Sequence, residues 1–266
     1  MEMVLGTQPT FSDLIMKPKV IDVFTFNNEY DILDIRLNVL RPYVDRFIAV
    51  QSPTTFTGKP KPIYELPAEV ESFVNSEDYT PEEIELAENS PNTQGAAHWK
   101  HEFLQKERIK QALTGLNPDD VVFAGDVDEI WEMPKWLPIL NTTPHKLKLR
   151  VYTYYLNNRS NEEFWGTLVA RYRDIKDECL NHLRMNATKT KEYCGWHFTS
   201  MGDLQKKLDD QYTKESYNTP KIRENLAENI KNNRDFLGRD FIIQIDESEW
   251  PEYLKSTRDK YLHLLK

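Results

Sequence analysis

Residues 20–51 constrain the fold more than any other part of the sequence, because two β-rich runs enclose one helical repeat. The runs Val20–Phe26 and Arg46–Gln51 have the composition of strands, and the segment between them, Glu29–Leu40, repeats apolar residues with a helical period. A strand, a helix and a strand of these lengths form a βαβ unit, whose strands run parallel and are joined by a right-handed crossover. The sequence therefore predicts an α/β fold with a mostly parallel central sheet flanked by helices.

A third apolar run ends in two carboxylates. Val121–Ala124 has the pattern of a buried strand and is followed by Asp126 and Asp128. Side chains two residues apart share one face of an extended strand, so these carboxylates can converge on one point. Paired carboxylates suit Mg²⁺ or Mn²⁺, and such an ion would hold the phosphates of a nucleotide. The alternative is an acidic turn that caps the next helix, and the pattern alone leaves both interpretations open.

The ends of the two strands of the βαβ unit carry polar side chains, namely Asn27, Asn28, Gln51 and Ser52. Ligands of parallel sheets bind at the carboxyl ends of the strands. If the three strands are neighbours, these side chains lie beside Asp126 and Asp128. The loop Thr54–Pro62 follows and contains Lys59. It is either an ordinary solvated loop or a loop that reaches a phosphate.

The rest of the chain is predicted from the same signals. We expect a flexible arm at residues 1–19, followed by a single domain over residues 20–266 with a surface excursion at 65–95. The expected elements are a helix at His98–Leu113, a short helix or turn at Trp131–Leu140, paired strands at Lys146–Leu156 and Phe164–Tyr172 with a turn at Asn157–Asn161, a helix at Asp177–Met185, an aromatic strand or loop at Tyr193–Phe198, helices at Asp203–Asp210 and Pro220–Phe236, an extended stretch at Phe241–Ile245 and a final helix at Trp250–Leu265.

Charge and cysteine content limit the classes of function. Lys and Arg number 34 against 43 Asp and Glu, which gives a net charge of −9, and no basic block typical of nucleic-acid binding is present. The two cysteines, Cys179 and Cys194, are too few for a disulfide framework and lack metal-ligand spacing, so we expect reduced thiols. No run of 18 apolar residues and no signal-peptide core occur, so we expect a soluble, cytoplasmic protein, as would suit a microbial or viral enzyme in a host cytoplasm.

Five stretches, in one order along the chain, resemble glycosyltransferase family 17. They are Val23–Leu37, Val44–Ser52, Thr55–Pro62, Asp126–Ile130 and Gly195–His197, within residues 20–215. This family includes β-1,4-mannosyl-glycoprotein N-acetylglucosaminyltransferases. The resemblance implies a nucleotide-sugar-dependent glycosyltransferase of the GT-A fold. Two positions depart from the family pattern: Gln51 stands where a glutamate is usual, and Phe198 follows Gly-Trp-His where a cysteine is frequent.

The resemblance also implies a reaction. An inverting, metal-dependent enzyme would move a sugar, with N-acetylglucosamine as one candidate, from a UDP-sugar to a hydroxyl of a glycan or glycoconjugate. Mn²⁺ or Mg²⁺ would stabilise the leaving diphosphate as a Lewis acid. The implied metal ligands are Asp126, Asp128 and His197, and His197 could instead be a hydrogen-bonded histidine inside an aromatic cluster. The candidate donor-binding residues are Asn27, Glu29, Arg36, Gln51, Lys59 and Asp126.

Several roles have more than one candidate. Arg36 could contact the diphosphate or could pair with Asp31 or Asp34 within its helix. Inversion needs one general base to deprotonate the acceptor hydroxyl. Glu215 and Glu178 rank as near equals for this role, with Asp177 as a further candidate, and each could instead be a solvated carboxylate. The candidate sugar-stacking or core side chains are Trp165 and Trp196.

Two other classes of function compete with a transferase. One is a phosphohydrolase of the haloacid dehalogenase type, whose first strand ends in Asp-x-Asp and which would use Asp126 as its nucleophile. That motif normally lies near the amino end of a chain, and the stretches between residues 23 and 62 would stay unexplained. The other is a non-catalytic module that binds a sugar nucleotide or glycan, against which the presence of Asp126, Asp128 and His197 argues.

Overall fold

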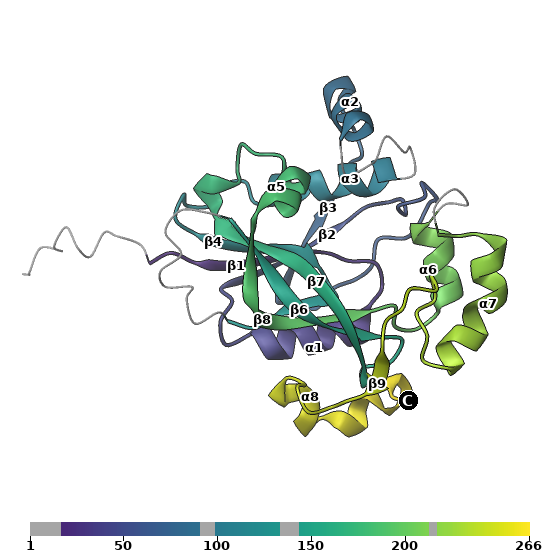
Figure 1. Cartoon of the computed structure of the whole chain (residues 1–266). Helices are drawn as coiled ribbons and strands as arrows, with labels where there is room; N and C mark the ends of the chain where they lie inside the picture. The colour runs from purple at the N-terminus through teal and green to yellow at the C-terminus, as the bar shows by residue number, and fades with distance from the viewer. Residues whose placement is uncertain (1–16, 91–98, 134–143, 213–216) are drawn as a thin grey trace, which may run out of the picture.

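The computed structural model describes residues 17–90, 99–133, 144–212 and 217–266. In this part of the chain the strands form one curled sheet in the order β3-β2-β1-β4-β7-β6-β8-β5, with β9 paired to β7 (Figure 1). The strands are β1 (Val20–Thr25), β2 (Arg46–Gln51), β3 (Val70–Val74), β4 (Val121–Asp126), β5 (Glu129–Trp131), β6 (His145–Thr153), β7 (Asn158–Arg171), β8 (Thr188–Thr199) and β9 (Ile243–Ile245).

The helices surround this sheet. The α-helices are α1 (Tyr30–Leu40), α2 (Pro81–Asn89), α3 (Lys100–Glu107), α4 (Ile109–Ala112), α5 (Leu180–Asn186), α6 (Leu204–Gln211), α7 (Pro220–Lys231) and α8 (Glu252–Ser256), and the 3₁₀ helices are η5 (Tyr172–Asp174) and η6 (Arg258–Leu264). Helices α1 and α8 lie on one side of the sheet, while α3 and α5 lie on the other (Figure 1). None of the helices in the described ranges is long and apolar enough to cross a membrane.

The prediction of an α/β fold is confirmed, but the sheet is mixed rather than mostly parallel. Strand β1 runs parallel to β2 and β4, and β2 runs parallel to β3, as the βαβ unit predicts. Strands β4, β6 and β9 each pair with β7 in antiparallel orientation. The physical reason is the short turn between β6 and β7, because a parallel connection needs a crossover of a dozen or more residues.

Alternation along the strands divides the core into two layers. In β1, Phe24 packs with α1 and with Trp250 near α8, whereas Ile21 and Val23 pack with Ile109 and Leu180 on the opposite face. Successive side chains of a strand point to opposite faces, so a strand with apolar residues on both faces fills both layers at once. This burial on both faces fixes the register of β1 and β4, and with it the position of the residues that follow them.

The stretch predicted as a surface excursion, residues 65–95, contains a strand and a helix within its described part. Strand β3 extends the sheet beside β2, and α2 begins with a capping box in which Thr80 and Glu83 exchange hydrogen bonds. The pattern hid this strand because it lies at the sheet edge, where Glu71 and Ser72 are exposed. An edge strand needs few apolar residues, so its sequence resembles that of a loop.

Other boundaries also differ from the predictions. The helix expected at His98–Leu113 is two helices, α3 and α4, which meet at Arg108. The turn expected at Asn157–Asn161 lies mostly within β7, because the chain reverses earlier, at Tyr154, where φ is +68°. Trp131 ends β5 instead of starting a helix, the helix expected from Asp177 begins at Leu180, and the final helix is divided into α8 and η6 at Thr257. The helix expected at Pro220–Phe236 ends at Lys231, and the aromatic stretch Tyr193–Phe198 is part of the longer strand β8. Residues 134–140 of the expected helix or turn lie outside the described ranges.

Both cysteines are free thiols, as predicted. Burial and the nearby Glu107 carboxylate raise the pKa of Cys179 to about 11, and burial raises the pKa of Cys194 as well. Only the thiolate reacts with disulfide reagents. We expect Cys179 in the native protein at pH 8 to react with a dithiobenzoate reagent about 100-fold more slowly than in the unfolded chain, because less thiolate is present. The rate should rise about tenfold per pH unit; equal rates in the native and unfolded protein would contradict the burial of the thiols.

Candidate active site

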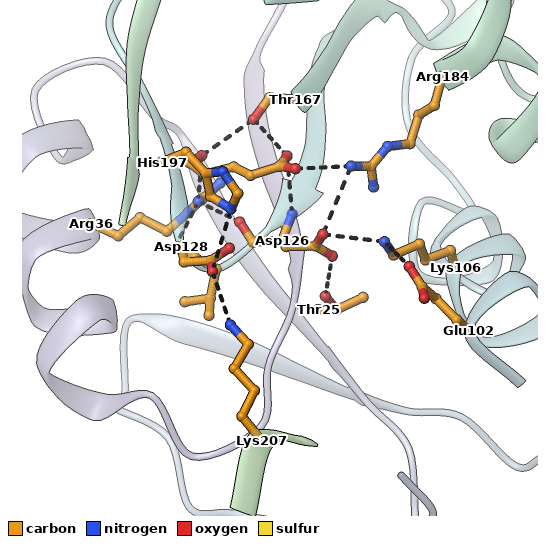
Figure 2. Close-up of polar contacts among 12 residues, drawn as sticks. Thr25, Arg36, Glu102, Lys106, Asp126, Asp128, Thr167, Arg184, His197 and Lys207 are labelled. Atoms are coloured by element: carbon orange, nitrogen blue, oxygen red, sulfur yellow. Dashed lines mark hydrogen bonds and ion pairs between the residues drawn. The ribbon is translucent and has the colours of Figure 1, made fainter. Parts of the chain in front are cut away.

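The acidic pair predicted from the sequence lies between two strands. Asp126 is the last residue of β4, and Glu129 begins β5, so Val127 and Asp128 form the connection. Asp126 is in register with Thr25 at the end of β1, and the Thr25 hydroxyl donates to Asp126 Oδ1 at 2.7 Å. The ends of β1 and β4 therefore present their polar side chains at one edge of the sheet (Figure 2).

Asp126 is bound by two cations from helices on one side of the sheet. Its Oδ2 lies 3.2 Å from Lys106 Nζ of α3 and 3.8 Å from Arg184 Nη2 of α5 (Figure 2). Burial alone would raise the pKa of the Asp126 carboxyl, but the charges of Lys106 and Arg184 outweigh it and hold the pKa far below its usual range. Asp126 is therefore a carboxylate at any physiological pH, and it fixes two positive charges beside it.

Asp128 faces a different pair of groups. Its Oδ2 lies 3.6 Å from His197 Nε2 and 3.9 Å from Lys207 Nζ, with His197 on β8 and Lys207 on α6. The pairing of β5 with β8 brings His197 opposite Glu129, and the imidazole stacks on Phe164 with 4.1 Å between ring centroids. Burial opposes ionisation of both partners, but their mutual attraction lowers the pKa of Asp128 and raises that of His197.

Glu129, the residue after Asp128, is buried, and two glycines leave the space that its side chain fills. A Cβ on Gly125 would lie 2.5 Å from Glu129 Oε2, and one on Gly166 would lie 2.6 Å from Glu129 Cδ, so only glycine fits at either position. Arg184 Nη2 donates to Glu129 Oε1 at 2.9 Å, and the Thr167 hydroxyl lies 3.2 Å from Oε2. The buried carboxylate thus neutralises part of the Arg184 charge and sets the position of its guanidinium.

Arg36 holds the backbone of the acidic connection, the segment Asp126–Glu129 that joins β4 to β5. Its guanidinium forms two hydrogen bonds with the Asp22 carboxylate, at 2.8 and 2.7 Å, and neither side chain is exposed. Its Nη1 also donates to the backbone carbonyls of Asp126, Val127 and Glu129 at 3.1, 3.1 and 2.9 Å. The proposed contact of Arg36 with a diphosphate and its pairing with Asp31 or Asp34 are therefore both wrong, because the side chain is enclosed on the core side of the connection.

A pocket of about 350 Å³ opens over these groups. It is bounded by the carboxyl ends of β1, β2 and β4 and by α3, α5 and α6. Its walls carry six carboxylates, namely Glu29, Glu102, Asp126, Asp128, Glu129 and Asp210, and four basic side chains, namely Lys61, Lys106, Arg184 and Lys207. The excess of negative charge opposes a bare anionic ligand, whereas an anion that arrives with a divalent cation is compensated.

The structure brings part of the predicted set together. Asn27, Glu29, Ser52, Asp126, Asp128 and His197 line this pocket, and Asn28 lines a second pocket beside it. The pocket does not include Gln51, Lys59, Asp177, Glu178, Trp165 or Trp196. Glu215 lies outside the described residues.

Each residue outside the pocket has another partner or position. Gln51 is buried and donates to the carbonyl of Tyr64, while the Lys59 ammonium donates to the carbonyl of Asp209. The indole groups of Trp165 and Trp196 donate to the carbonyls of Thr190 and Glu249. Asp177 and Glu178 precede α5 and are exposed. We therefore keep none of these six side chains in the donor site.

Sequence reasoning missed three of the four basic residues of the pocket, whereas the fourth, Lys61, lies in the predicted loop Thr54–Pro62. Lys106, Arg184 and Lys207 lie on three helices that are distant in sequence, and each one looks like an ordinary solvated helix residue. One weak signal was available for Lys106, because its helix contains Glu102 four residues earlier and the two form an ion pair at 2.7 Å. Such pairs are common on solvated helices, so this spacing does not identify a site.

The side chains of Asp128 and His197 suit a divalent ion whose other ligands come from a bound substrate. Among the described residues, no group of three His, Cys, Asp or Glu side chains could hold a metal by itself. Ions such as Mg²⁺ are usually bound by one or two carboxylates together with substrate phosphates rather than by a cage of protein groups. Asp128 and His197 supply a carboxylate and an imidazole of the type that Mn²⁺ accepts, and the surplus negative charge of the pocket favours a cation.

Comparison with models of protein families gives a match over most of the chain. The model of glycosyltransferase family 17 matches residues 9–230, which is most of the chain and includes all the strands from β1 to β8. A search of curated proteins finds no match. The family match covers the stretches between residues 23 and 62 that a phosphohydrolase of the haloacid dehalogenase type leaves unexplained, and the carboxylate that would be its nucleophile, Asp126, is already bound by Thr25 and Lys106.

Proposed function

The chain belongs to glycosyltransferase family 17 and is therefore a glycosyltransferase, and on this basis we propose that it transfers a sugar from a UDP-sugar to a hydroxyl of a glycan or glycoconjugate. We further propose that the reaction requires Mn²⁺ or Mg²⁺, inverts the anomeric carbon and takes place on a GT-A fold. The observation that carries this proposal is the pocket at the ends of β1, β2 and β4, which is lined by Asp128, His197 and four basic side chains.

The pocket has the place and the size for a sugar nucleotide. Ligands of α/β sheets bind outside the carboxyl ends of the strands, at the point where the strand order reverses. Strand β1 lies between β2 and β4 in the sheet, so the pocket opens at such a point. The side nearest β2 is lined by Val50, Ser52 and Thr54, and we assign it to the nucleoside. A volume of about 350 Å³ is within the usual range for small-molecule sites.

Asp128 and His197 are the residues that we propose as ligands of the ion. An ion bound there would neutralise charge on the leaving diphosphate as a Lewis acid. Both carboxylate oxygens of Asp126 already accept hydrogen bonds, one from Thr25 and the other from Lys106. We therefore propose that Asp126 positions Lys106 and Arg184 and does not bind the ion directly. Arg184 Nη1 is buried and has no hydrogen-bond partner among the described residues, which leaves it available to a phosphate oxygen.

Metal-dependent donor binding is the first expected result. UDP with Mn²⁺ should raise the melting temperature of the protein, because a ligand at 100 times its dissociation constant stabilises the folded state by about 2.7 kcal/mol. UDP with a chelator, and Mn²⁺ alone, should each give a smaller shift. The measurement is differential scanning fluorimetry over a panel of UDP-sugars, and the sugar with the largest shift identifies the donor. Cleavage of that donor at full rate without a divalent ion would disprove the metal requirement.

A further inference from the structure

A second pocket of about 230 Å³ adjoins the donor pocket. The two pockets share a wall made by Asn27, Glu29, Asp128, Lys207, Asp210 and Gln211. A transfer reaction needs two ligands that meet at one centre, and the shared wall is where occupants of the two pockets can meet. If the donor occupies the larger pocket, an acceptor in the smaller pocket brings its hydroxyl to the side of the shared wall that faces away from the donor.

Two of the three carboxylates on this wall already have cationic partners. Asp128 faces His197 and Lys207, and Asp210 accepts from Lys206 Nζ at 2.8 Å. Within the described residues, no basic side chain forms an ion pair with Glu29. Glu29 is thus the carboxylate of the shared wall that remains free to accept a proton.

The position of Glu29 is nevertheless well defined. The chain turns at Asn28, where φ is +75°, and Glu29 Oε2 accepts from the backbone N–H of Asn27 at 2.8 Å. The carbonyl of Glu29 accepts from the backbone N–H of Leu33, which ties the residue to α1. One carboxylate oxygen holds the side chain in place, and the other makes no hydrogen bond with a described residue. Beside it, Asn27 Oδ1 is buried and has no hydrogen-bond partner in the described part of the chain, which provides an acceptor for a second polar group of a ligand.

We propose that Glu29 is the general base of the transfer reaction, an inference that rests on the proposed function. The Glu29 carboxylate takes the proton of the acceptor hydroxyl while that oxygen forms its bond to the anomeric carbon. The bond between the anomeric carbon and the diphosphate oxygen breaks at the same time, and its electron pair leaves with the nucleoside diphosphate. This assignment replaces Asp177 and Glu178, which line neither pocket.

The test is Glu29→Gln with water and azide as alternative nucleophiles. Glutamine keeps an oxygen that can accept from Asn27 but cannot take a proton. With Mn²⁺ and the UDP-sugar that gives the largest thermal shift, we expect donor binding within about threefold of wild type and hydrolysis slower by about 10²–10⁴-fold. Azide is an anion that needs no base, so it should restore turnover in the variant and yield the glycosyl azide. A residue with a merely structural role would not be rescued in this way.

The control is Glu252→Gln, the same chemical change at the start of α8, where the side chain is exposed. It should leave binding and hydrolysis unchanged. Hydrolysis by Glu29→Gln within threefold of wild type would overturn the assignment, and so would equal losses of donor binding and turnover without azide rescue. Absence of donor binding in the wild-type protein would instead disprove the proposed function, and the inference would fall with it.

Discussion

Replacing Asp128 by asparagine is expected to lower metal-dependent donor cleavage by about 10³-fold, because a Lewis acid contributes several kcal/mol to such a step and each factor of ten corresponds to about 1.4 kcal/mol. The amide has nearly the shape of the carboxylate but lacks its charge. His197 and Lys207 lie 3.6 and 3.9 Å from the Asp128 carboxylate, and neither distance is that of a strong hydrogen bond. The main effect on cleavage should come through the ion. Loss of the attraction between Asp128 and His197 should also lower stability, which the melting temperature of the variant measures.

The distinctive result is a weaker response to Mn²⁺. The concentration of Mn²⁺ that gives half-maximal cleavage should rise at least about tenfold in Asp128→Asn, in line with the loss of a charged ligand. Asp126→Asn should instead weaken donor binding at saturating Mn²⁺, because it frees Lys106 and Arg184 from the positions that Asp126 gives them. Asp119→Asn, in the exposed turn that precedes the same strand, is the matched control. A cleavage rate of Asp128→Asn within threefold of wild type would exclude Asp128 as a ligand.

Local patterns were sufficient to predict the scaffold of this site. Strands β1 and β2 and helix α1 form the predicted βαβ unit, and the end of β4 places Asp126 beside Thr25. These predictions depend on the pattern of apolar residues, because a strand that is buried on both faces needs apolar side chains at nearly every position. The pairing of β7 with β4 depends on contacts between distant segments, and no periodicity reveals it. The antiparallel orientation of β7 relative to β4 could therefore not be predicted from the sequence.

The charges of the site show the same limit. Asp126 and Asp128 are two residues apart, so their presence at one site was predictable, but Asp128 lies in the connection after β4 and faces His197 and Lys207 instead of the partners of Asp126. Lys106 and Arg184, 20 and 58 positions from Asp126 along the chain, meet that carboxylate only after α3 and α5 pack on the sheet. Arg36 was a candidate for the diphosphate because a guanidinium is a bidentate partner of phosphate oxygens, and its helix offered Asp31 and Asp34 as alternative partners. The burial of Arg36 depends on Asp22, a charged residue in the middle of the mostly apolar strand β1. A charged residue at such a position predicts a buried ionic partner.

Arg36→Met is expected to be the most destabilising of the substitutions considered, with a loss of about 3–5 kcal/mol in the free energy of unfolding. Methionine leaves the Asp22 carboxylate buried without its ionic partner, and the indole N–H of Trp131, at 2.8 Å, becomes its remaining side-chain donor. The carbonyls of Asp126, Val127 and Glu129 also lose their shared donor. Donor cleavage should fall together with stability, because the connection that carries Asp128 is no longer held.

Urea denaturation followed by tryptophan fluorescence measures this loss, with Arg46→Met as the matched control. Arg46 pairs with Glu71 at 2.7 Å on the partly exposed side of β2, and such pairs contribute about 1 kcal/mol or less. The double variant Asp22→Leu/Arg36→Met should recover part of the stability, because most of the cost comes from the unpaired buried charge rather than from the lost attraction. A loss in Arg36→Met no larger than that in Arg46→Met would show that the buried pair does not hold the acidic connection in place.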